Sequence, residues 1–487
     1  MRVDVAIVGG GIAGLAVAYE LSRRGTSFVV LERAGRAGGV IFSEEVDGYV
    51  IDGGPDALLI QKPEAITLCR EIGLGDRLVS TKPPRVAFIQ RGGRLHALPA
   101  GSVLGIPTTI GPFLATGLFS WSGKLRMGAE LFVPPKTGDA DESIGDFMRR
   151  RFGREATEYL AEPLLAGIHA GDVDKLSMAA LFPRFVEAER KHGSLLRAFR
   201  TPNVSEAPRT SAQAPERQRS RPNVSEGAFK SLPGGLSEMV RALVAAIGLP
   251  NVRTGTTVTR VSGDGPFSIH TQPGERIEAR AVVLAAPAYA AGDLLRERDA
   301  ELAGLCQAVP YASAATVAMA FTRDAVSRPL DGSGFVVPRV ERTGLLAASW
   351  LSSKWPGRAP DDRVLLRTFV GGARDPRALE CSDAELVSRS LAALRPLLGI
   401  ARDPLFTRIY RWERANAQHE VGHLARVASI DRLLARHPGI FVTGSGFRGV
   451  GVPDCVADGR KVARQAAEWA KQHERVPETT EIRRSSR

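Results

Sequence analysis

The order of apolar and polar positions changes several times in the first part of the chain. Residues 3–8 are apolar apart from Asp4, which predicts a buried strand. Glycines interrupt the run at residues 9–14, and the segment that follows, up to Arg24, is typical of a helix. The β-branched and aromatic run Phe28–Leu31 predicts another strand. Strand, glycine turn, helix and strand in this order predict a βαβ unit of a parallel sheet.

The glycines are spaced Gly-x-Gly-x-x-Gly, at Gly9, Gly11 and Gly14, and the second strand ends on Glu32. In such a motif the first glycine permits a tight turn, the second lets a pyrophosphate approach the backbone, and the third lets helix and strand pack closely. The Glu32 carboxylate would accept hydrogen bonds from a ribose hydroxyl. A glycine turn without a ligand is the alternative, but strand, helix and acid in register favour a dinucleotide site.

Further loops indicate which dinucleotide binds. A second glycine pair lies at 38–39, and residues 52–56 read Asp-Gly-Gly-Pro-Asp, where a ligand can again approach the backbone. Near the carboxyl terminus, a strand and turn at 441–446 precede a helix that we predict from Asp454 to Lys471, with its first amides directed at the ligand. A nicotinamide dinucleotide needs none of these segments, whereas an extended FAD does. The sequence therefore predicts bound FAD.

Composition is that of a globular protein of two or three domains. The chain has 487 residues, more than one core usually supports, and 44% of them are apolar. Its four cysteines are widely spaced, so we expect neither a metal site nor a disulfide framework, and a reducing cytoplasm fits best. The chain enters a strand at once, so no leader peptide is expected. The net charge of +12 suits anionic lipid or an anionic substrate, and without a nucleic-acid motif it does not predict nucleic-acid binding.

No charged residue occurs between Arg94 and Lys124. The stretch is long enough for a membrane span, but its prolines and glycines argue against a continuous transmembrane helix. Two alternatives stay open: a buried wall along an apolar cavity, or a surface that dips into one leaflet of a membrane. In the second, Trp121 would lie at the interface, with Lys124 and Arg126 at the headgroups.

The chain can also be divided into a linker, a tail and three domains. Residues 201–230 are rich in Pro, Ser, Arg and Glu and hold Pro-Asn-Val-Ser-Glu twice, at 202–206 and 222–226, which predicts a disordered linker. A solvated tail is expected at 473–487. The remaining residues are expected to form three domains. The FAD-binding domain consists of residues 1–82, 231–291 and 434–472, a mainly helical insert spans 83–200, and the substrate-binding domain spans 292–433.

The segment Glu32-x-x-x-Arg36-x-Gly38-Gly39 resembles that of the FAD-dependent amine oxidase and protoporphyrinogen oxidase superfamily. Two blocks in the middle of the chain, Gly167–Asp172 and Phe182–Glu189, are more specific and resemble the oxygen-dependent protoporphyrinogen oxidases of bacteria. The resemblance implies an α/β fold with a discontinuous Rossmann-type FAD domain of the glutathione reductase type. It also implies a mixed-sheet substrate domain and a mainly helical insert that associates with a membrane.

The implied activity is the six-electron oxidation of protoporphyrinogen IX to protoporphyrin IX in heme biosynthesis, with dioxygen as acceptor and hydrogen peroxide as product. Bacterial relatives differ in substrate, so coproporphyrinogen III is the alternative. Amine oxidation is less favoured, because no aromatic pair stands out beyond Trp412. A homodimer, peripheral membrane contact and transfer of the product to a ferrochelatase are partner hypotheses that the sequence leaves open.

The resemblance also implies roles for individual residues. The Gly167 carbonyl is expected to accept a pyrrole N–H, and Phe335, Val336 and Phe369 to grip the macrocycle, with core packing as the alternative. Lys62 is expected to pair with a propionate or else to be a solvated lysine. No side chain is expected to act as a general base, because hydride transfer is flavin chemistry. The predicted cofactor contacts are Gly9, Gly11, Ile12, Ala13, Gly14, Glu32, Arg33, Gly38, Gly39, Val40, Gly54, Pro55, Asp56, Val258, Trp412, Gly444, Ser445, Val450, Gly451 and Val452.

Two histidines, His169 and His419, lie in or near the segments that carry the resemblance. His169 follows Gly167 closely, and we expect it to line the pocket or pack rather than to act in catalysis. His419 belongs to the run Asn416-Ala417-Gln418-His419, where family members usually have Met-Pro-Gln-Tyr. This departure leaves the local loop shape open.

Overall fold

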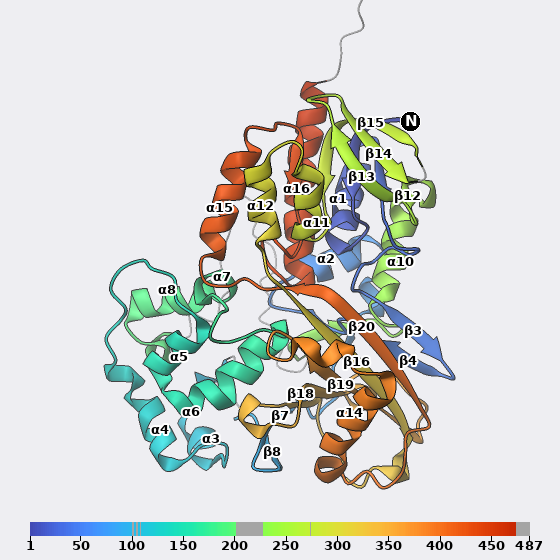
Figure 1. The fold of residues 1–487 in the computed structure, drawn as a ribbon. Helices are drawn as coiled ribbons and strands as arrows, with labels where there is room; N and C mark the ends of the chain where they lie inside the picture. Colours follow the sequence, from blue (N-terminus) through green and yellow to red (C-terminus); the bar gives the residue numbers. More distant parts are fainter. Residues whose placement is uncertain (100–101, 104–105, 108, 201–226, 273, 474–487) are drawn as a thin grey trace, which may run out of the picture.

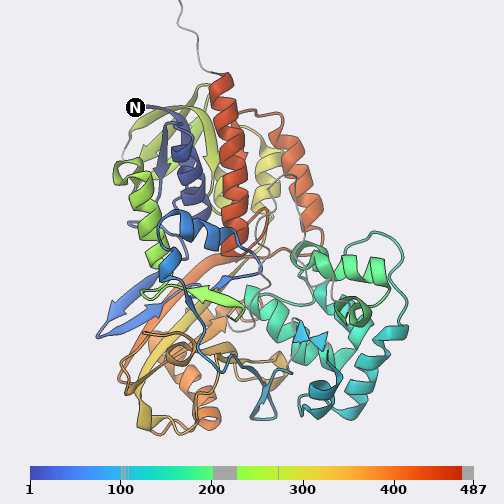
Figure 2. The same cartoon turned by 180° about the vertical axis from the view of Figure 1, so that it is seen from behind.

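The computed structural model describes residues 1–99, 102–103, 106–107, 109–200, 227–272 and 274–473. They form three parts (Figures 1 and 2): a sheet with helices on both faces, a second sheet backed by one long helix, and a group of short helices beside the second sheet. This is the mixed α/β fold that the sequence predicts.

The first sheet has the strand order β12-β2-β1-β15-β14-β13, with β21 beside β15. Its parallel strands are β1 (Arg2–Val8), β2 (Phe28–Leu31), β12 (Val252–Arg253), β15 (Arg276–Leu284) and β21 (Ile440–Val442), and its antiparallel strands are β13 (Thr257–Ser262) and β14 (Phe267–Gln272). One face packs on α1 (Ile12–Arg23), α2 (Glu64–Glu71), α10 (Ser237–Ile247) and α16 (Val452–Gln472). The other packs on α11 (Ala288–Leu295), α12 (Ala300–Gln307) and α15 (His423–Leu434).

The second sheet has the order β20-β16-β19-β18-β17-β7-β8. Its strands are β7 (Ala87–Arg91), β8 (Arg94–Ala97), β16 (Tyr311–Thr322), β17 (Gly334–Val336), β18 (Leu345–Trp350), β19 (Arg363–Gly371) and β20 (Phe406–Ala417). Only the pair formed by β17 and β7 is parallel within this described sheet. The helix α14 (Asp383–Leu398) packs its apolar residues against one face. The hairpin of β7 and β8 belongs to this sheet, so the predicted helical range 83–200 begins with strands.

The short helices share a core of their own. They are α3 (Ile110–Ala115), α4 (Trp121–Gly128), α5 (Ile144–Phe152), α6 (Arg154–Ala156), the π-helix η3 (Thr157–Ala166), α7 (Met178–Leu181), α8 (Pro183–His192) and α9 (Leu195–Arg200). In the described residues, no helix is long and apolar enough to cross a membrane. Lys124 is 7% exposed and donates to the Leu114 carbonyl, so its expected place at lipid headgroups is wrong. Arg126 is partly exposed and donates to the Arg151 carbonyl, and its expected headgroup contact stays a prediction.

The remaining strands and the remaining α-helix are short. They are β3 (Ser43–Val46), β4 (Tyr49–Asp52), β5 (Leu58–Leu59), β6 (Val79–Ser80), β9 (Ser102–Val103), β10 (Ile106–Pro107), β11 (Phe229–Ser231) and α13 (Leu351–Lys354). Because β11 pairs with β5 and β6, the predicted linker 201–230 ends in a strand rather than in a disordered segment. Its two pentapeptides, and the tail apart from His473, lie outside the described residues.

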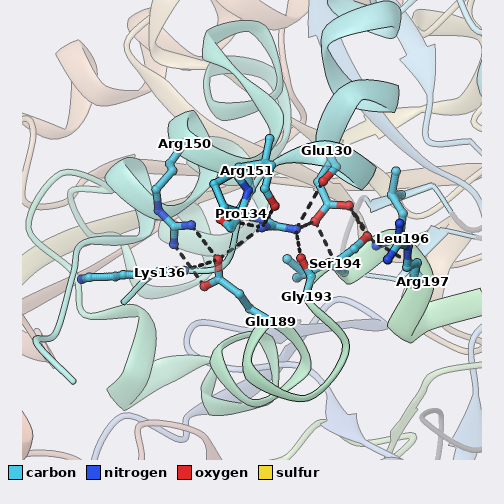
Figure 3. Close-up of polar contacts among 12 residues, drawn as sticks. Glu130, Pro134, Lys136, Arg150, Arg151, Glu189, Gly193, Ser194, Leu196 and Arg197 are labelled. Atoms are coloured by element: carbon cyan, nitrogen blue, oxygen red, sulfur yellow. Dashed lines mark hydrogen bonds and ion pairs between the residues drawn. The ribbon is translucent and has the colours of Figure 1, made fainter. Parts of the chain in front are cut away.

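A buried charge cluster joins the short helices (Figure 3). Arg151 on α5 forms ion pairs with Glu130 and with Glu189 of α8, and all three side chains are at most 4% exposed. Glu130 also accepts the Ser194 hydroxyl at 2.6 Å and the Leu195 N–H at 2.9 Å. These bonds satisfy charges that would otherwise be costly to bury, and they fix α8 and the start of α9 relative to α5.

Candidate functional site

One cavity of about 3150 Å³ lies where the three parts meet. Every residue predicted to bind the cofactor lines it except Gly14, whose role is in packing. Among the predicted substrate residues, Lys62, Gly167, Val336 and Phe369 line it. The structure thus brings together segments from both ends and the middle of the chain, and the binding roles of these residues stay predictions.

The amino terminus of α1 opens onto the cavity. Its first helical hydrogen bond runs from the Leu15 N–H to the Gly11 carbonyl at 2.9 Å, so the earlier amides of the helix have no partner within it. A Cβ on Gly14 would lie 2.0 Å from the Gly9 carbonyl oxygen, whereas a Cβ on Gly11 would meet no atom within 4 Å. The turn is therefore closed toward the protein and open toward the cavity, as a pyrophosphate site requires.

Glu32 and the 36–41 loop form the adjacent wall. The Glu32 carboxylate accepts the Gly10 N–H at 2.6 Å and the Ala34 N–H at 2.7 Å. The backbone thus orients this carboxylate, and each oxygen keeps a lone pair for a ribose hydroxyl. Arg36 donates to three carbonyls of its own loop at 2.7–3.2 Å, so this arginine shapes the loop and was missed as a site residue.

The 52–56 loop forms another wall and is held by buried charges. The Asp56 carboxylate accepts Lys354 Nζ at 2.7 Å, the Trp355 indole N–H at 2.8 Å and Arg367 Nη2 at 2.8 Å. Arg367 also donates to the Gly54 carbonyl at 2.8 Å. Burial alone would raise the pKa of Asp56, but Lys354 and Arg367 outweigh it and hold this pKa well below its usual range. Asp56 therefore acts on the site by fixing its loop.

We expect Asp56→Asn to lower the free energy of unfolding most at neutral pH and progressively less in acid. The pKa of Asp56 is lower in the folded protein than in the unfolded chain, so ionised Asp56 stabilises the fold above the unfolded pKa of about 3.9, and this stabilisation is lost as the pH falls below that value. Urea unfolding of both proteins between about pH 7 and pH 3 measures the difference. Exposed Asp47→Asn is the control, and a pH-independent difference for Asp56→Asn would contradict the assignment.

The helix α16 directs its amino terminus at the cavity. It begins at Val452, two residues before the predicted start, with Gly451 as its N-cap, and the Asp454 carboxylate accepts the Gly451 N–H at 3.2 Å. Lys62 donates to both oxygens of Asp454, at 2.7 and 2.8 Å, although its side chain is 49% exposed. Lys62 therefore already has a carboxylate partner at the cavity edge, a contact that sequence did not reveal.

Histidines support the turn before α16. His419 Nε2 donates to the Ser445 carbonyl at 2.8 Å, His423 Nε2 donates to the Phe447 carbonyl at 3.0 Å, and the two rings stack with centroids 3.7 Å apart. Burial lowers the pKa of both rings, that of His423 to about 4, so both are neutral at pH 7. The departure at 416–419 thus builds a support for Ser445, a predicted cofactor contact.

The side of the cavity expected to take substrate adjoins the π-helix η3. Gly167 follows η3 and its carbonyl accepts the Ala170 N–H at 3.1 Å. His169 lines the cavity, and burial lowers its pKa to about 4, which leaves it neutral at pH 7. Phe335 is 2% exposed and packs against Trp350 within the second sheet instead of lining the cavity. Val336 faces the opposite side of the strand, because successive side chains alternate across a sheet.

Comparison with known families defines the class of protein. The model of the flavin containing amine oxidoreductase family matches residues 12–467, and this chain belongs to that family. The flavin fits the features just described: the open face of Gly11, the unpartnered first amides of α1 and the oriented Glu32.

Individual relatives are similar over almost the whole chain. The coproporphyrinogen III oxidase of Bacillus subtilis (strain 168) is 35% identical over 95% of this chain and 97% of its own length. The chloroplastic protoporphyrinogen oxidase of Nicotiana tabacum is 30% identical over 95% of this chain and 85% of its own length. A crystal structure from Exiguobacterium sp. 255-15, provisionally assigned as a protoporphyrinogen oxidase, has a TM-score of 0.82 and 32% identity, and covers 96% of this chain and 98% of its own. Wild-type putrescine oxidase, at 18% identity and a TM-score of 0.67, shares the fold; the match covers 95% of this chain and 98% of its own.

Proposed function

We propose that this protein is an FAD-dependent oxidase that converts a porphyrinogen to the porphyrin in heme biosynthesis, with dioxygen as acceptor and hydrogen peroxide as product. The observation that carries the proposal is the continuous cavity of about 3150 Å³, which extends from the glycine turn at the amino terminus of α1 to the space beside Gly167. A pocket for one drug-sized ligand has about 300–1,000 Å³, so this cavity has room for an extended dinucleotide and a large substrate together.

The residues around α1 and α16 would hold the FAD. The amides of α1 and the open face of Gly11 suit its pyrophosphate, Glu32 suits its ribose, and the amino terminus of α16 suits the end of the flavin that becomes negative on reduction. When bound, FAD accepts the hydride equivalents and passes electrons to the acceptor. The support for FAD over a shorter flavin is that the amino termini of both helices, Glu32 and the 52–56 loop all line one cavity.

The chain's own contribution to the reaction is positioning and exclusion of water. His169 is neutral at pH 7, and its carbonyl accepts the Gln418 side-chain amide at 2.9 Å, which fixes the segment after Gly167. The wall formed by Val336 and Phe369 is apolar, so it suits a macrocycle held over the cofactor. We assign no residue to acid or base catalysis, in keeping with hydride chemistry at a flavin.

Two substrates compete within this proposal. Protoporphyrinogen IX is the substrate expected from sequence. Coproporphyrinogen III is the second candidate, and it is favoured by the names of the Bacillus subtilis, Propionibacterium freudenreichii and Staphylococcus aureus relatives, at 33–35% identity. Amine oxidation has the support of the shared fold alone.

Aerobic oxidation of both porphyrinogens by the purified yellow protein tests the proposal. Porphyrin fluorescence and peroxide should rise together with either substrate, and the ratio of kcat/KM values decides between them. If a flavin-loaded protein oxidises neither porphyrinogen, the proposed function is wrong.

We also propose that the helical part contacts a membrane on the cytoplasmic side. Its outer surface exposes large apolar side chains, which monomeric soluble proteins rarely cluster: Ile110, Leu114, Trp121, Leu125 and Phe132, at 45–84% exposure. Insertion of these side chains rather than headgroup pairing by Lys124 would provide the affinity. A homodimer and transfer of porphyrin to a ferrochelatase stay predictions.

Leu125→Glu/Phe132→Glu should abolish most binding to liposomes, because two exposed apolar side chains that would insert into the membrane are replaced by charges that an acyl region excludes. Cosedimentation with vesicles of phosphatidylglycerol and phosphatidylcholine measures the effect. Leu249→Glu is the control, because Leu249 is 71% exposed but lies in the FAD-binding part. Equal binding to liposomes by the double variant and the native protein would contradict the membrane contact and favour the alternative, in which this stretch is a buried wall along an apolar cavity.

A further inference from the structure

The helix α8 presents one face to the cavity. Arg184, Ala188 and Lys191 all line the cavity and recur at the spacing of helical turns. The wall around them is aromatic: the Phe182 ring lies 6.0 Å from that of Phe185 and 6.2 Å from the ring of His169. Because His169 belongs to the segment of Gly167, this face of α8 adjoins the chamber assigned to the substrate.

The buried charge cluster sets the rotation of α8 (Figure 3). Glu189 points away from the cavity face and accepts Arg150 Nη1 at 2.6 Å and Arg151 Nη1 at 3.3 Å, both from α5. With about 3.6 residues per turn, this contact leaves Arg184 and Lys191 on the cavity face and places Arg190 on a third face, where it pairs with Asp139. The direction of Arg184 is therefore determined by the fold and not by its own contacts.

Arg184 is half-buried and forms no hydrogen bond and no ion pair within the described part of the chain. The nearby carboxylate is that of Glu187, whose pKa is lowered mainly by its hydrogen bond to Lys191 and to a lesser extent by the charge of Arg184. Glu187, one turn along the helix, binds Lys191 Nζ at 2.5 Å instead. On this face of α8, Lys191 thus has its partner, whereas the guanidinium of Arg184 keeps its donors for a ligand. Guanidinium groups bind carboxylates in a bidentate geometry, which suits an acid at the edge of an apolar ligand.

We propose that Arg184 binds a peripheral carboxylate of the substrate and thereby favours coproporphyrinogen III, which has four propionates, over protoporphyrinogen IX, in which vinyl groups replace two of them. This inference rests on the proposed function and names a specificity-determining residue for the same cavity. The apolar rings of α8 contact the macrocycle beside the carboxylate, and the charge of Arg184 discriminates at its edge.

The test compares Arg184→Met with Arg190→Met, a matched change on the same helix that leaves the cavity wall intact. For Arg184→Met, KM for coproporphyrinogen III should rise roughly 10- to 100-fold, as expected for loss of one charged hydrogen-bonded contact, with kcat nearly unchanged. KM for protoporphyrinogen IX should change much less. Arg184→Lys should restore part of the loss, and Arg190→Met should behave as the native protein.

Thermal melting and flavin absorbance of each variant show that the fold is retained. The inference is overturned if Arg184→Met raises KM equally for both substrates, or changes KM for neither. Binding of the product coproporphyrin III, followed by quenching of its fluorescence, separates this result from failure of the proposed function. If the native protein oxidises neither substrate but binds coproporphyrin III more tightly than Arg184→Met does, the Arg184 site stands without the activity. If neither protein binds it, both proposals fail.

Discussion

Gly11→Val is expected to yield a folded protein that contains almost no flavin. Gly11 has a φ of −70°, which any residue adopts, and a Cβ at this position would meet no protein atom within 4 Å. The new side chain would project into the cavity where the pyrophosphate should lie. Overpacking of about 1–3 kcal/mol at such a contact weakens binding roughly 5- to 150-fold. The ratio of flavin to protein absorbance, together with the melting temperature, checks both halves of this expectation.

Gly14→Ala provides the contrast. Its Cβ would lie 2.0 Å from the Gly9 carbonyl oxygen, so α1 and β1 must separate, and the variant should lose thermal stability as well as flavin. Gly304→Ala is the control, because Gly304 lies within α12 and its Cβ would also meet no atom within 4 Å. A Gly11→Val protein with the native flavin content would show that this turn does not bind the cofactor.

Arg151→Met is expected to lower the free energy of unfolding by about 3–5 kcal/mol. The substitution leaves the carboxylates of Glu130 and Glu189 buried without their shared cation, and it removes donors to the Val133 and Gly193 carbonyls, both at 2.9 Å. Burying an unpaired charge is the costly step, so the loss exceeds that of a surface pair. Urea unfolding followed by circular dichroism measures the change.

Two further variants make this expectation specific. Arg154→Met breaks an exposed pair with Glu158 and should leave the free energy of unfolding almost unchanged. Adding Glu130→Gln to Arg151→Met should be less destabilising than the sum of the two single changes, because the uncompensated charge is removed together with its partner. Additive effects would mean that Glu130 and Arg151 do not act as a pair.

The first βαβ unit could be predicted because its signals are local. Turn, helix start and close packing each depend on glycines a few residues apart, so the spacing of Gly9, Gly11 and Gly14 reveals the cradle without knowledge of the rest of the chain. The strand at Phe28–Leu31 and the carboxylate of Glu32 follow from the same short segment. The start of α16 was missed by two residues, since its N-cap is Gly451 and not a side-chain cap.

The contacts that hold the site together are distant in sequence. Asp56 is bound by Lys354 and Arg367, which are 298 and 311 residues away, and Lys62 is bound by Asp454, which is 392 residues away. Nothing near Asp56 in the sequence indicates that Lys354 and Arg367 hold its carboxylate. Phe335 and Val336 show the same limit: both are apolar, and only their places in the sheet decide which one faces the cavity.

By itself, the sequence determined the mixed α/β class, the glycine turn that lines the cavity and the membership in a flavin-dependent family, because these depend on short motifs whose geometry the backbone imposes. Only the tertiary structure decided that Lys124 is buried, that residues 87–97 extend the second sheet, and that Arg184 lines the cavity. The physical reason is that burial and ion pairing depend on what lies opposite a side chain in space, and the neighbours that decide it here come from other elements of the chain.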